Sequence, residues 1–254
     1  MHRWNALVAI GDSFTEGLDD PALDGDGFRG WADRLAERLA VGRPEFRYAN
    51  LAVRGKLLQQ IVDEQVPEAI ALRPDLVTFC AGGNDILRPG SDPDALAALF
   101  DDAVARMRAA GSDVVICTGF DTKQIPVMKH LRGKVATYNT HLWATADRHG
   151  CRVVDLWSMT VLHDPRAWGD DRLHLSPEGH ERVALRACDA LGVEVESRWD
   201  DPWPPAPPVD WVSLRREDLR WAKEHFVPWI GRRLRGESSG DGVRAKRPKL
   251  TPVA

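Results

Sequence analysis

The sequence predicts an α/β fold in which helices cover both faces of a parallel β-sheet. Up to about residue 192, five short apolar runs alternate with longer segments in which apolar residues recur at helical spacing. Such alternation indicates βαβ units, whose strands lie parallel and are buried on both faces. Because crossovers between parallel strands are right-handed, we expect a doubly wound, three-layer α/β/α sandwich with a five-stranded sheet.

The expected strands are short and apolar, and several are rich in β-branched residues. They cover residues 6–10, 46–50, 76–81, 114–118 and 152–156. In an open sheet of this kind, binding and catalytic sites form beyond the carboxyl ends of the strands. Residues that follow a strand directly are therefore the first candidates for chemistry.

Helical periodicity fills the intervals between the strands and is interrupted by glycines typical of helix ends. The expected helices cover residues 31–39, 57–72, 93–110, 126–149 and 177–191. A bend is expected before Pro67, since proline has no N–H for the helical ladder. Ser176 followed by Pro177 is typical of an N-cap and a first helical residue, which fixes the start of the last helix.

Composition divides the chain into three parts. Residues 1–198 hold the sandwich, residues 199–235 form a Pro- and Trp-rich linker with a C-terminal helix, and residues 236–254 form a basic tail. Five prolines stand among the nine residues 200–208, and helical periodicity resumes over 212–234. The tail is rich in Gly, Ser, Pro, Lys and Arg without apolar periodicity, so we expect it to be disordered.

The second part of the chain is unusual in its tryptophan content, since half of the ten tryptophans lie there. The interpretation we favour is a helix laid on the core, with its indole rings covering an apolar patch. One alternative is a homodimerisation arm, because aromatic residues are enriched in interfaces. Another is weak attachment to a membrane surface through these rings and Arg232, Arg233 and Arg235.

Charge and hydropathy argue against several classes of protein. The net charge is -4, but residues 231–254 carry seven Lys/Arg against two Asp/Glu, so the body of the chain is acidic. An acidic body argues against a nucleic-acid-binding domain. No stretch approaches the length of a membrane span, and no secretory signal precedes the first strand. We therefore expect a cytoplasmic protein.

The cysteines are widely spaced and form no C-x-x-C pair; they are Cys80, Cys117, Cys151 and Cys188. Their apolar neighbours favour buried free thiols over disulfides or metal ligands. The sequence also contains no H-E-x-x-H, P-loop or G-x-G-x-x-G pattern. We therefore expect neither a metal ion nor an organic cofactor.

Gly11-Asp12-Ser13 follows the first expected strand and places a hydroxyl at the edge where a site should form. Taken alone, the tripeptide could equally be a turn in which Asp12 and Ser13 bond to the backbone. Residues 236–240 also match the G-x-S-x-G nucleophile motif in sequence alone. That motif requires a strand before it and a helix after it, and neither is expected there, so we reject it.

Gly82-Gly83-Asn84-Asp85 directly follows the third strand. The glycines let the backbone approach a ligand closely, and the amide of Asn84 is a donor suited to an oxyanion. Gly55 follows the second strand, and its N–H can also point into the site. Both segments also have a purely structural interpretation. Residues 82–85 could be a glycine-rich turn that ends in a helix cap, and Gly55 could simply permit a positive φ angle.

His174 lies in the loop between the fifth strand and the last helix. A serine becomes nucleophilic when an imidazole takes its proton and a third group orients that imidazole. Asp171, three residues earlier, can reach Nδ1 and leave Nε2 free to accept a proton. The adjacent Asp170 is the weaker candidate. His180 falls inside the following helix, where we expect it to face solvent or to pack structurally.

In their joint order, these residues resemble the GDSL, or SGNH, hydrolase family over roughly residues 5–192. The matches are Gly11-Asp12-Ser13-Phe14 in block I, Gly55 in block II, Gly82-x-Asn84-Asp85 in block III and Asp171-x-x-His174 in block V. Phe14 stands where Leu is commonest, a mild departure that leaves the chemistry intact. The resemblance implies a flavodoxin-like strand order 2-1-3-4-5 and a shallow, open site.

The resemblance also implies a serine esterase with a catalytic triad. Ser13 would attack the ester carbonyl, His174 would take its proton, and Asp171 would orient His174. The oxyanion would be held by the backbone amides of Ser13 and Gly55 and by the side chain of Asn84. Because Ser13, His174 and Asp171 are all present, we favour an enzyme over a catalytically silent binding module on the same fold.

The substrate is expected to be a small carboxylic ester. Loops 19–28, 86–92 and 121–127 should line the site, and the charged and amide side chains of the first and third favour a polar substrate over a long lipid. We assign Asp12 and Asp85 to substrate binding. A short, acetyl-type acyl group on a polar alcohol or sugar is the preferred interpretation. Thioesterase, lysophospholipase-type or acyltransferase activity on the same triad is the alternative.

Overall fold

The computed structural model describes residues 3–22, 25, 27–125, 128–205, 220–221, 224 and 240–253. Its centre is a six-stranded sheet of order β5-β4-β3-β1-β2-β6. The strands are β1 (Ala6–Gly11), β2 (Arg47–Asn50), β3 (Leu76–Cys80), β4 (Asp113–Cys117), β5 (Arg152–Val154) and β6 (Arg247–Pro252). The first five strands pair in parallel, which confirms the expected order 2-1-3-4-5.

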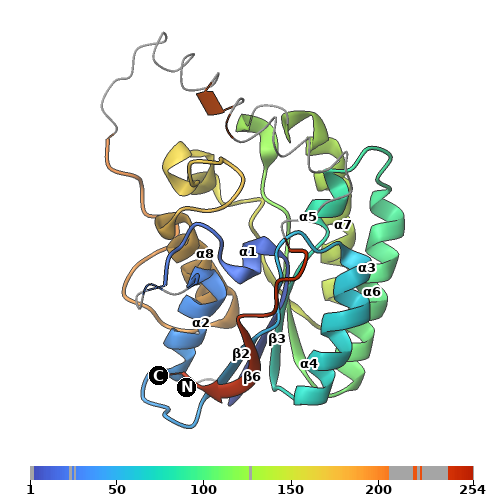
Figure 1. Ribbon diagram of the computed structural model, residues 1–254, viewed down its shortest axis with the longest axis vertical. Helices are drawn as coiled ribbons and strands as arrows, with labels where there is room; N and C mark the ends of the chain where they lie inside the picture. The colour runs from blue at the N-terminus through green and yellow to red at the C-terminus, as the bar shows by residue number, and fades with distance from the viewer. Residues whose placement is uncertain are drawn as a thin grey trace.

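Helices cover both faces of the sheet, as the three-layer prediction requires (Figure 1). The α-helices are α1 (Ser13–Glu16), α2 (Gly30–Ala40), α3 (Leu58–Gln60), α4 (Val66–Leu72), α5 (Gly83–Ile86), α6 (Pro93–Ala109), α7 (Arg132–His149) and α8 (Pro177–Leu191). Short 3-10 turns η2 (Thr122–Gln124), η3 (Met128–Leu131), η4 (Thr160–His163) and η5 (Pro165–Ala167) lie in the loops. Helices α2 and α8 pack together on one face, and α6 and α7 pack together on the other.

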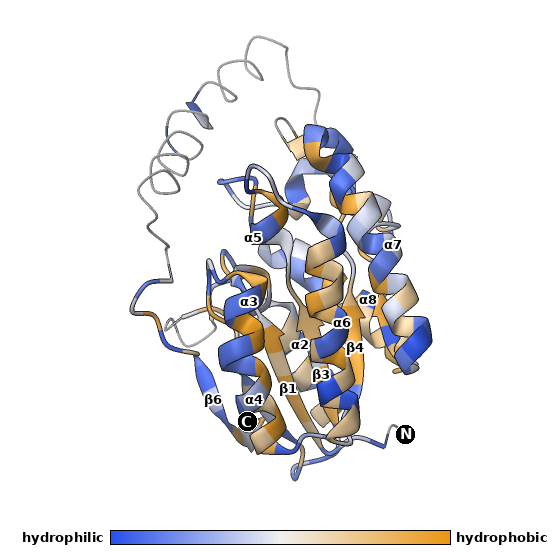
Figure 2. Cartoon of the chain, turned by 90° about the vertical axis from the view of Figure 1, so that its right-hand side faces the viewer, coloured by the Kyte–Doolittle hydropathy of each residue, from blue (hydrophilic) through white to orange (hydrophobic). Residues whose placement is uncertain are grey.

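The core consists of two apolar clusters, one on each face of the sheet. Figure 2 shows the central strands coloured as hydrophobic between helices of mixed character. Trp31 and Leu35 of α2 are completely buried on one face. Phe79 of β3 stacks on Phe100 of α6 on the other, with ring centroids 4.1 Å apart. No helix in the described part of the chain is both long and apolar enough to cross a membrane.

The bend predicted before Pro67 is present as a change of helix type. A π-helical stretch, η1 (Ile61–Gln65), separates α3 from α4. Proline cannot donate to the helical ladder, so a wider turn before it is a low-cost solution. The turn leaves Gln65 buried, with its side chain directed at the end of β1. The expected helix at 126–149 begins later, at Arg132, after η3, and residues 126–127 lie outside the described part.

The prediction of a disordered tail over 236–254 is wrong for its last part, because residues 247–252 form β6, antiparallel to β2. The exposed edge of β2 offers unpaired backbone groups, and a strand can pair with them without apolar periodicity. Lys246 anchors the strand, since its Nζ lies within hydrogen-bond distance of four oxygen atoms. These are the carbonyl oxygens of Glu16, Phe28 and Arg29 and Oδ2 of Asp33, with which it forms an ion pair. Lys246, one of the cations of the basic tail, therefore has specific partners on the core.

The beginning of the Trp-rich part packs on the core as expected. Trp199 and Trp203 lie against the apolar cluster that contains α8. The guanidinium of Arg186 stands 4.8 Å from the ring centroid of Trp199, and that of Arg182 stands 4.1 Å from the ring of Trp203. The helix expected over 212–234 lies outside the described residues, apart from residues 220–221 and 224. The dimerisation and membrane-surface alternatives stay predictions.

Candidate active site

Ser13 is the first residue of α1 and follows β1 immediately. The sharp exit from the strand depends on Gly11, whose φ is +153° and where a Cβ atom would lie 2.4 Å from the carbonyl oxygen of Cys80. The buried Gln65 fixes this turn from the other side. Its Oε1 accepts from the Gly11 N–H at 2.8 Å, and its Nε2 donates to the Gly11 carbonyl at 2.9 Å. The hydroxyl of Ser13 is thus held at the carboxyl end of the central strand.

A compact loop before α8 carries the predicted acid and base. The Oδ1 atom of Asp171 accepts from the backbone N–H groups of Leu173 and His174, at 2.8 and 2.9 Å. Its Oδ2 atom lies 2.6 Å from Nδ1 of His174. On the far side of the ring, Nε2 lies 2.9 Å from Oγ of Ser13. The structure therefore brings together Ser13, His174 and Asp171 from positions more than 150 residues apart in the chain.

The hydrogen-bond partners define the tautomer of His174. A carboxylate only accepts, so Nδ1 carries the proton toward Asp171 and Nε2 accepts from the Ser13 hydroxyl. Burial alone lowers the pKa of His174, but the hydrogen bond and charge of Asp171, with the charges of Asp19 and Asp12, raise the pKa above its ordinary value of 6.5. For the carboxyl group of Asp171, burial has the opposite effect and raises the pKa. The hydrogen bonds and charge of His174 and the hydrogen bonds from the loop amides outweigh burial, so the pKa of Asp171 is lowered.

The three predicted oxyanion donors lie on adjacent loops. Ser13 is the first residue of α1, so its N–H has no acceptor within the helix. Gly55 has a φ of +74°, as expected for a turn. Its neighbours are fixed, because Glu16 accepts from the Arg54 backbone N–H at 2.7 Å and Asn84 donates to the Lys56 carbonyl at 3.1 Å.

Asn84 is committed to contacts that the sequence did not indicate. Its Nδ2 donates to Asp12 Oδ2 at 3.1 Å as well as to the carbonyl of Lys56 at 3.1 Å. An amide nitrogen carries two hydrogens, so one of these bonds must lengthen or be shared when a substrate oxyanion arrives. Asn84 lines the cavity beside Ser13, where such a shift is sterically open.

The carboxylates assigned to substrate binding turn out to hold the loops. Asp12 is the N-cap of α1, with Oδ1 accepting from the N–H of Phe14 at 3.1 Å. Burial raises the pKa of Asp12 to about 6, against the lowering effect of hydrogen bonds from Phe14 and Asn84 and of the charge of His174. Asp85 accepts from the Leu58 N–H at 2.9 Å and is not among the described residues that line the cavity. The assignment of Asp12 and Asp85 to substrate binding stays a prediction.

A cavity of about 160 Å³ opens beside Ser13 and His174. Its walls are largely apolar; they include Phe14, Ile86, Leu87, Phe120, Met128, Leu131, Val135 and Leu156. Of the three loops expected to line the site, 86–92 contributes Ile86 and Leu87, and 121–127 contributes Thr122. No described residue of 19–28 lines it. The cavity is therefore more apolar than the loop composition suggested.

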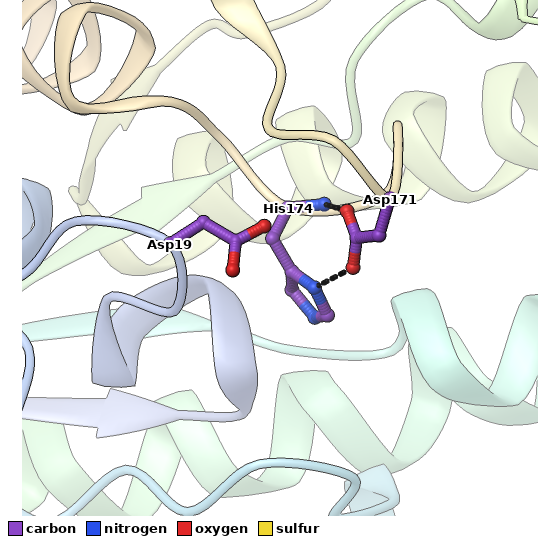
Figure 3. A group of neighbouring side chains, drawn as sticks. All are labelled: Asp19, Asp171 and His174. Carbon is purple, nitrogen blue, oxygen red and sulfur yellow. Dashed lines mark hydrogen bonds and ion pairs between the residues drawn. The ribbon is translucent and has the colours of Figure 1, made fainter. Parts of the chain in front are cut away.

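One further carboxylate, Asp19, lies near the imidazole (Figure 3). Among the described residues, Asp19, Asp171 and His174 are the group of potential metal-ligating side chains, with ligand atoms within 4.8 Å of one another. The 2.6 Å contact between Asp171 and His174 is a hydrogen bond with a proton in it. We therefore interpret these side chains as an acid–histidine group and assign no metal centre to them.

Sequence reasoning missed two residues that position the site. Gln65 could have been noticed, as a polar residue on the buried face of an apolar helical segment. Trp221 could not, because its role depends on a tertiary contact: its Nε1 donates to the backbone carbonyl of Asp171 at 2.7 Å. The guanidinium of Arg172 lies over the ring of Trp221, 5.5 Å from its centroid. A residue of the C-terminal part thus contacts the loop that carries the acid.

Comparisons with known proteins indicate the family and the fold of the chain. Residues 9–182 match the model of the GDSL-like lipase/acylhydrolase family. A GDSL lipase of Mycobacterium tuberculosis is 28% identical over 205 residues, which is 76% of this chain and 84% of that protein. In fold, the chain is similar to Axe2, an acetylxylan esterase from Geobacillus stearothermophilus, with a TM-score of 0.62 and 23% identity over 76% of this chain and 97% of the other. The structure of TesA gives a TM-score of 0.61 and 22% identity, over 73% of this chain and 97% of the other.

Proposed function

We propose that this chain, which belongs to the GDSL-like lipase/acylhydrolase family, hydrolyses short-chain carboxylic esters. In this proposal Ser13 is the nucleophile. The observation that carries the proposal is the continuous set of hydrogen bonds from Asp171 through His174 to Ser13, at 2.6 and 2.9 Å. A neutral imidazole within hydrogen-bond reach of a hydroxyl is the arrangement that general-base catalysis requires.

In the proposed mechanism, His174 Nε2 takes the hydroxyl proton as Ser13 Oγ attacks the ester carbonyl carbon. Asp171 keeps Nδ1 protonated, orients the ring and stabilises the imidazolium. The tetrahedral intermediate collapses when His174 returns the proton to the leaving alcohol, which leaves an acyl group on Ser13. Water, deprotonated by His174, attacks the acyl-enzyme, and Ser13 recovers its proton as the carboxylic acid leaves.

The oxyanion is assigned to the backbone N–H groups of Ser13 and Gly55 and to the side chain of Asn84. The position of Ser13 at the start of α1 favours negative charge, because helix N-termini present free N–H groups. Asn84 reaches the same edge of the sheet from the start of α5 and lines the cavity with Ser13. Losing one donor of this kind typically lowers kcat by about a hundredfold to a thousandfold.

The acyl group is assigned to the apolar cavity beside Ser13. Its volume of about 160 Å³ is close to that of an engineered cavity of about 150 Å³ that takes up benzene, so a chain of roughly six carbons is the upper limit. The alcohol then faces the loops outside the cavity, which carry charged side chains such as Asp19 and Arg172. This division supports a short acyl group on a polar alcohol.

The proposal is tested by hydrolysis of p-nitrophenyl esters. Ser13→Ala should lower kcat for the acetyl ester by about ten thousandfold or more. Ser238→Ala, in the rejected 236–240 pattern, is the matched control and should leave kcat unchanged. Turnover by Ser13→Ala close to that of the unaltered protein would contradict the nucleophile assignment.

Chain length is tested with acetyl, butyryl, hexanoyl and octanoyl esters of the same leaving group. We expect kcat/KM to be highest at or below six carbons and to fall at octanoyl, because the cavity is then filled. An optimum at octanoyl would overturn the short-chain proposal while leaving the nucleophile assignment intact.

A further inference from the structure

Asp19 stands beside the imidazole of His174, on the loop between α1 and α2. One of its carboxylate oxygens lies within 4.8 Å of a ring nitrogen of His174 and of a carboxylate oxygen of Asp171. In the view of Figure 3, Asp19 and Asp171 flank the imidazole from two sides. The two carboxylates come from elements that are 152 residues apart in the chain, numbered 19 and 171, so their approach is a product of the fold.

The position of Asp19 is defined by its neighbours in the chain. Leu18 is fixed because its carbonyl accepts from Nε2 of His180 at 3.0 Å. Asp20 is buried, and its Oδ2 accepts from the Gly30 N–H at 3.0 Å and from Arg34 Nε at 2.8 Å. Asp19 itself has a left-handed backbone, with φ of +67°. Its side chain is therefore directed by an anchored loop.

The loop of His174 leaves room for this carboxylate. A Cβ atom at Gly169 would lie 2.3 Å from Oδ2 of Asp19, so a side chain at position 169 would displace it. The Gly169 N–H donates to the His174 carbonyl at 2.8 Å, which places the bare glycine in the same closed loop as the imidazole. Asp19 thus packs against the backbone that holds His174.

Among the described residues, the charged groups with the largest influence on His174 are carboxylates. They are Asp171 on its own loop, Asp19 on the α1–α2 loop and Asp12 at the end of β1. When the imidazole is neutral, the charges of Asp19 and Asp171 repel one another across a short distance. When His174 takes the proton of Ser13, a positive charge arises between them. Asp19 therefore interacts more favourably with the transition state than with the resting enzyme, which is the condition for accelerating the reaction.

We propose that Asp19 is a second carboxylate partner of His174, a positioning residue that stabilises the imidazolium formed when His174 deprotonates Ser13. The inference rests on the proposed function, since it requires His174 to act as the base. The inference adds to the triad a residue that lies outside the four motif blocks matched in this sequence.

The test compares Asp19→Asn with the unaltered protein in the pH dependence of kcat/KM. Asparagine keeps the shape of the side chain and tolerates a left-handed backbone, so the loop should persist. We expect kcat to fall about tenfold with KM little changed, and the acid limb of kcat/KM to move about one unit to lower pH. The shift is downward because removing a negative charge makes the imidazole easier to deprotonate.

Asp170→Asn is the matched control. It removes one carboxylate from the loop that carries His174, but Asp170 is exposed and is not among the groups with the largest influence on the pKa of His174. The acid limb should stay in place in this variant. A limb that moves equally in both variants would indicate a general charge effect and would overturn the specific role of Asp19.

A readout independent of activity is the NMR titration of the His174 Cε1–H. The midpoint should fall in Asp19→Asn and remain unchanged in Asp170→Asn. A uniform loss of activity in Asp19→Asn with an unmoved limb and an unmoved midpoint would mean a structural role and would overturn the inference. Failure of the proposed function is distinguishable, because Ser13→Ala would then retain activity.

Discussion

His174 and His180 lie in neighbouring regions of the molecule, the loop before α8 and the first turns of that helix, yet they have opposite environments. The side chain of His174 is 23% exposed, and its nitrogens meet a carboxylate and a hydroxyl. His180 is 1% exposed, and its nitrogens meet backbone groups only. Its Nδ1 accepts from the Trp31 N–H at 3.1 Å, and its Nε2 donates to the Leu18 carbonyl at 3.0 Å.

The difference shows that partners, more than burial, decide what a histidine does. Burial lowers the pKa of both rings. At His180 this effect dominates, and the charges of Arg34 and Lys246 act in the same direction, so the pKa is lowered to about 4. At His174 the hydrogen bond and charge of Asp171 outweigh the effect of burial, so the pKa is raised. One ring is poised to accept a proton, while the other is a neutral cross-link between α2, the Leu18 loop and α8.

The largest effect should come from removing the base. His174→Ala should lower kcat for p-nitrophenyl acetate by about ten thousandfold, as expected when one member of a triad is lost. Its free energy of unfolding should change by about 1 kcal/mol or less, since the ring is partly exposed and its partners face the cavity. Steady-state kinetics and urea unfolding measure the two quantities. Full activity in this variant would contradict the assignment of His174 as the base, and with it the functional difference between His174 and His180.

His180→Ala should have the opposite profile. It leaves the Trp31 N–H and the Leu18 carbonyl without partners in a buried place, so we expect a loss of about 3 kcal/mol in the free energy of unfolding. Activity of the folded fraction should fall modestly, through the Leu18–Asp20 loop. A variant of unchanged stability with abolished turnover would show that His180 belongs to the chemistry instead.

The pH dependence separates the two rings further. The acid limb of kcat/KM should have its midpoint above pH 6.5, because the pKa of His174 is raised and the base must be neutral. For stability, the pKa of His180 is depressed, so the unfolded chain takes up this proton first as pH falls. The stabilisation by His180 is therefore complete above pH 6.5 and is lost as pH falls toward 4.

The difference in unfolding free energy between the unaltered protein and His180→Ala should accordingly shrink by about 3 kcal/mol over this range. Asp12 and Asp33, each with a pKa that burial raises to about 6, titrate in the same window in both proteins and cancel in the difference. Urea unfolding at pH 7.5, 6, 5 and 4 measures it. A difference that grows on acidification would contradict the assigned state of His180.

The smallest effect is expected at Trp221, which touches the His174 region through Asp171. Trp221→Phe removes the hydrogen bond to the Asp171 carbonyl but keeps a ring beneath Arg172. A lost bond of about 1 kcal/mol corresponds to roughly a fivefold lower kcat. Trp199→Phe is the control, since its Nε1 bonds to the exposed Asp189 far from the loop and kcat should not change. Equal kcat values for both variants would exclude a role for Trp221 in positioning the acid.

Much of the fold could be predicted from local pattern. Apolar runs and helix caps depend on neighbours in the chain, so the first five strands and the Ser176 cap of α8 are confirmed. Strand β6 could not be predicted, because pairing of Arg247–Pro252 with β2 uses backbone groups that every residue carries. The alternatives for His180 could not be separated either, since its burial follows from contacts with Leu18 and Trp31.

The candidate site shows the same division. Ser13, Asp171 and His174 could be named from motif spacing, and the structure brings them together. The apolar cavity could not be predicted from the sequence, since its walls come from several helices and loops whose side chains converge only in the fold. Asp19 was expected only as part of a lining loop, and its approach to His174 depends on the bare Gly169.

The most direct test of the central assignment is covalent labelling by a fluorophosphonate, followed by intact-mass measurement and peptide mapping. The geometry predicts a single adduct on Ser13, absent in Ser13→Ala, formed at the normal rate in His180→Gln and much more slowly in His174→Ala. An adduct on another serine, or none on the folded and unaltered protein, would contradict it.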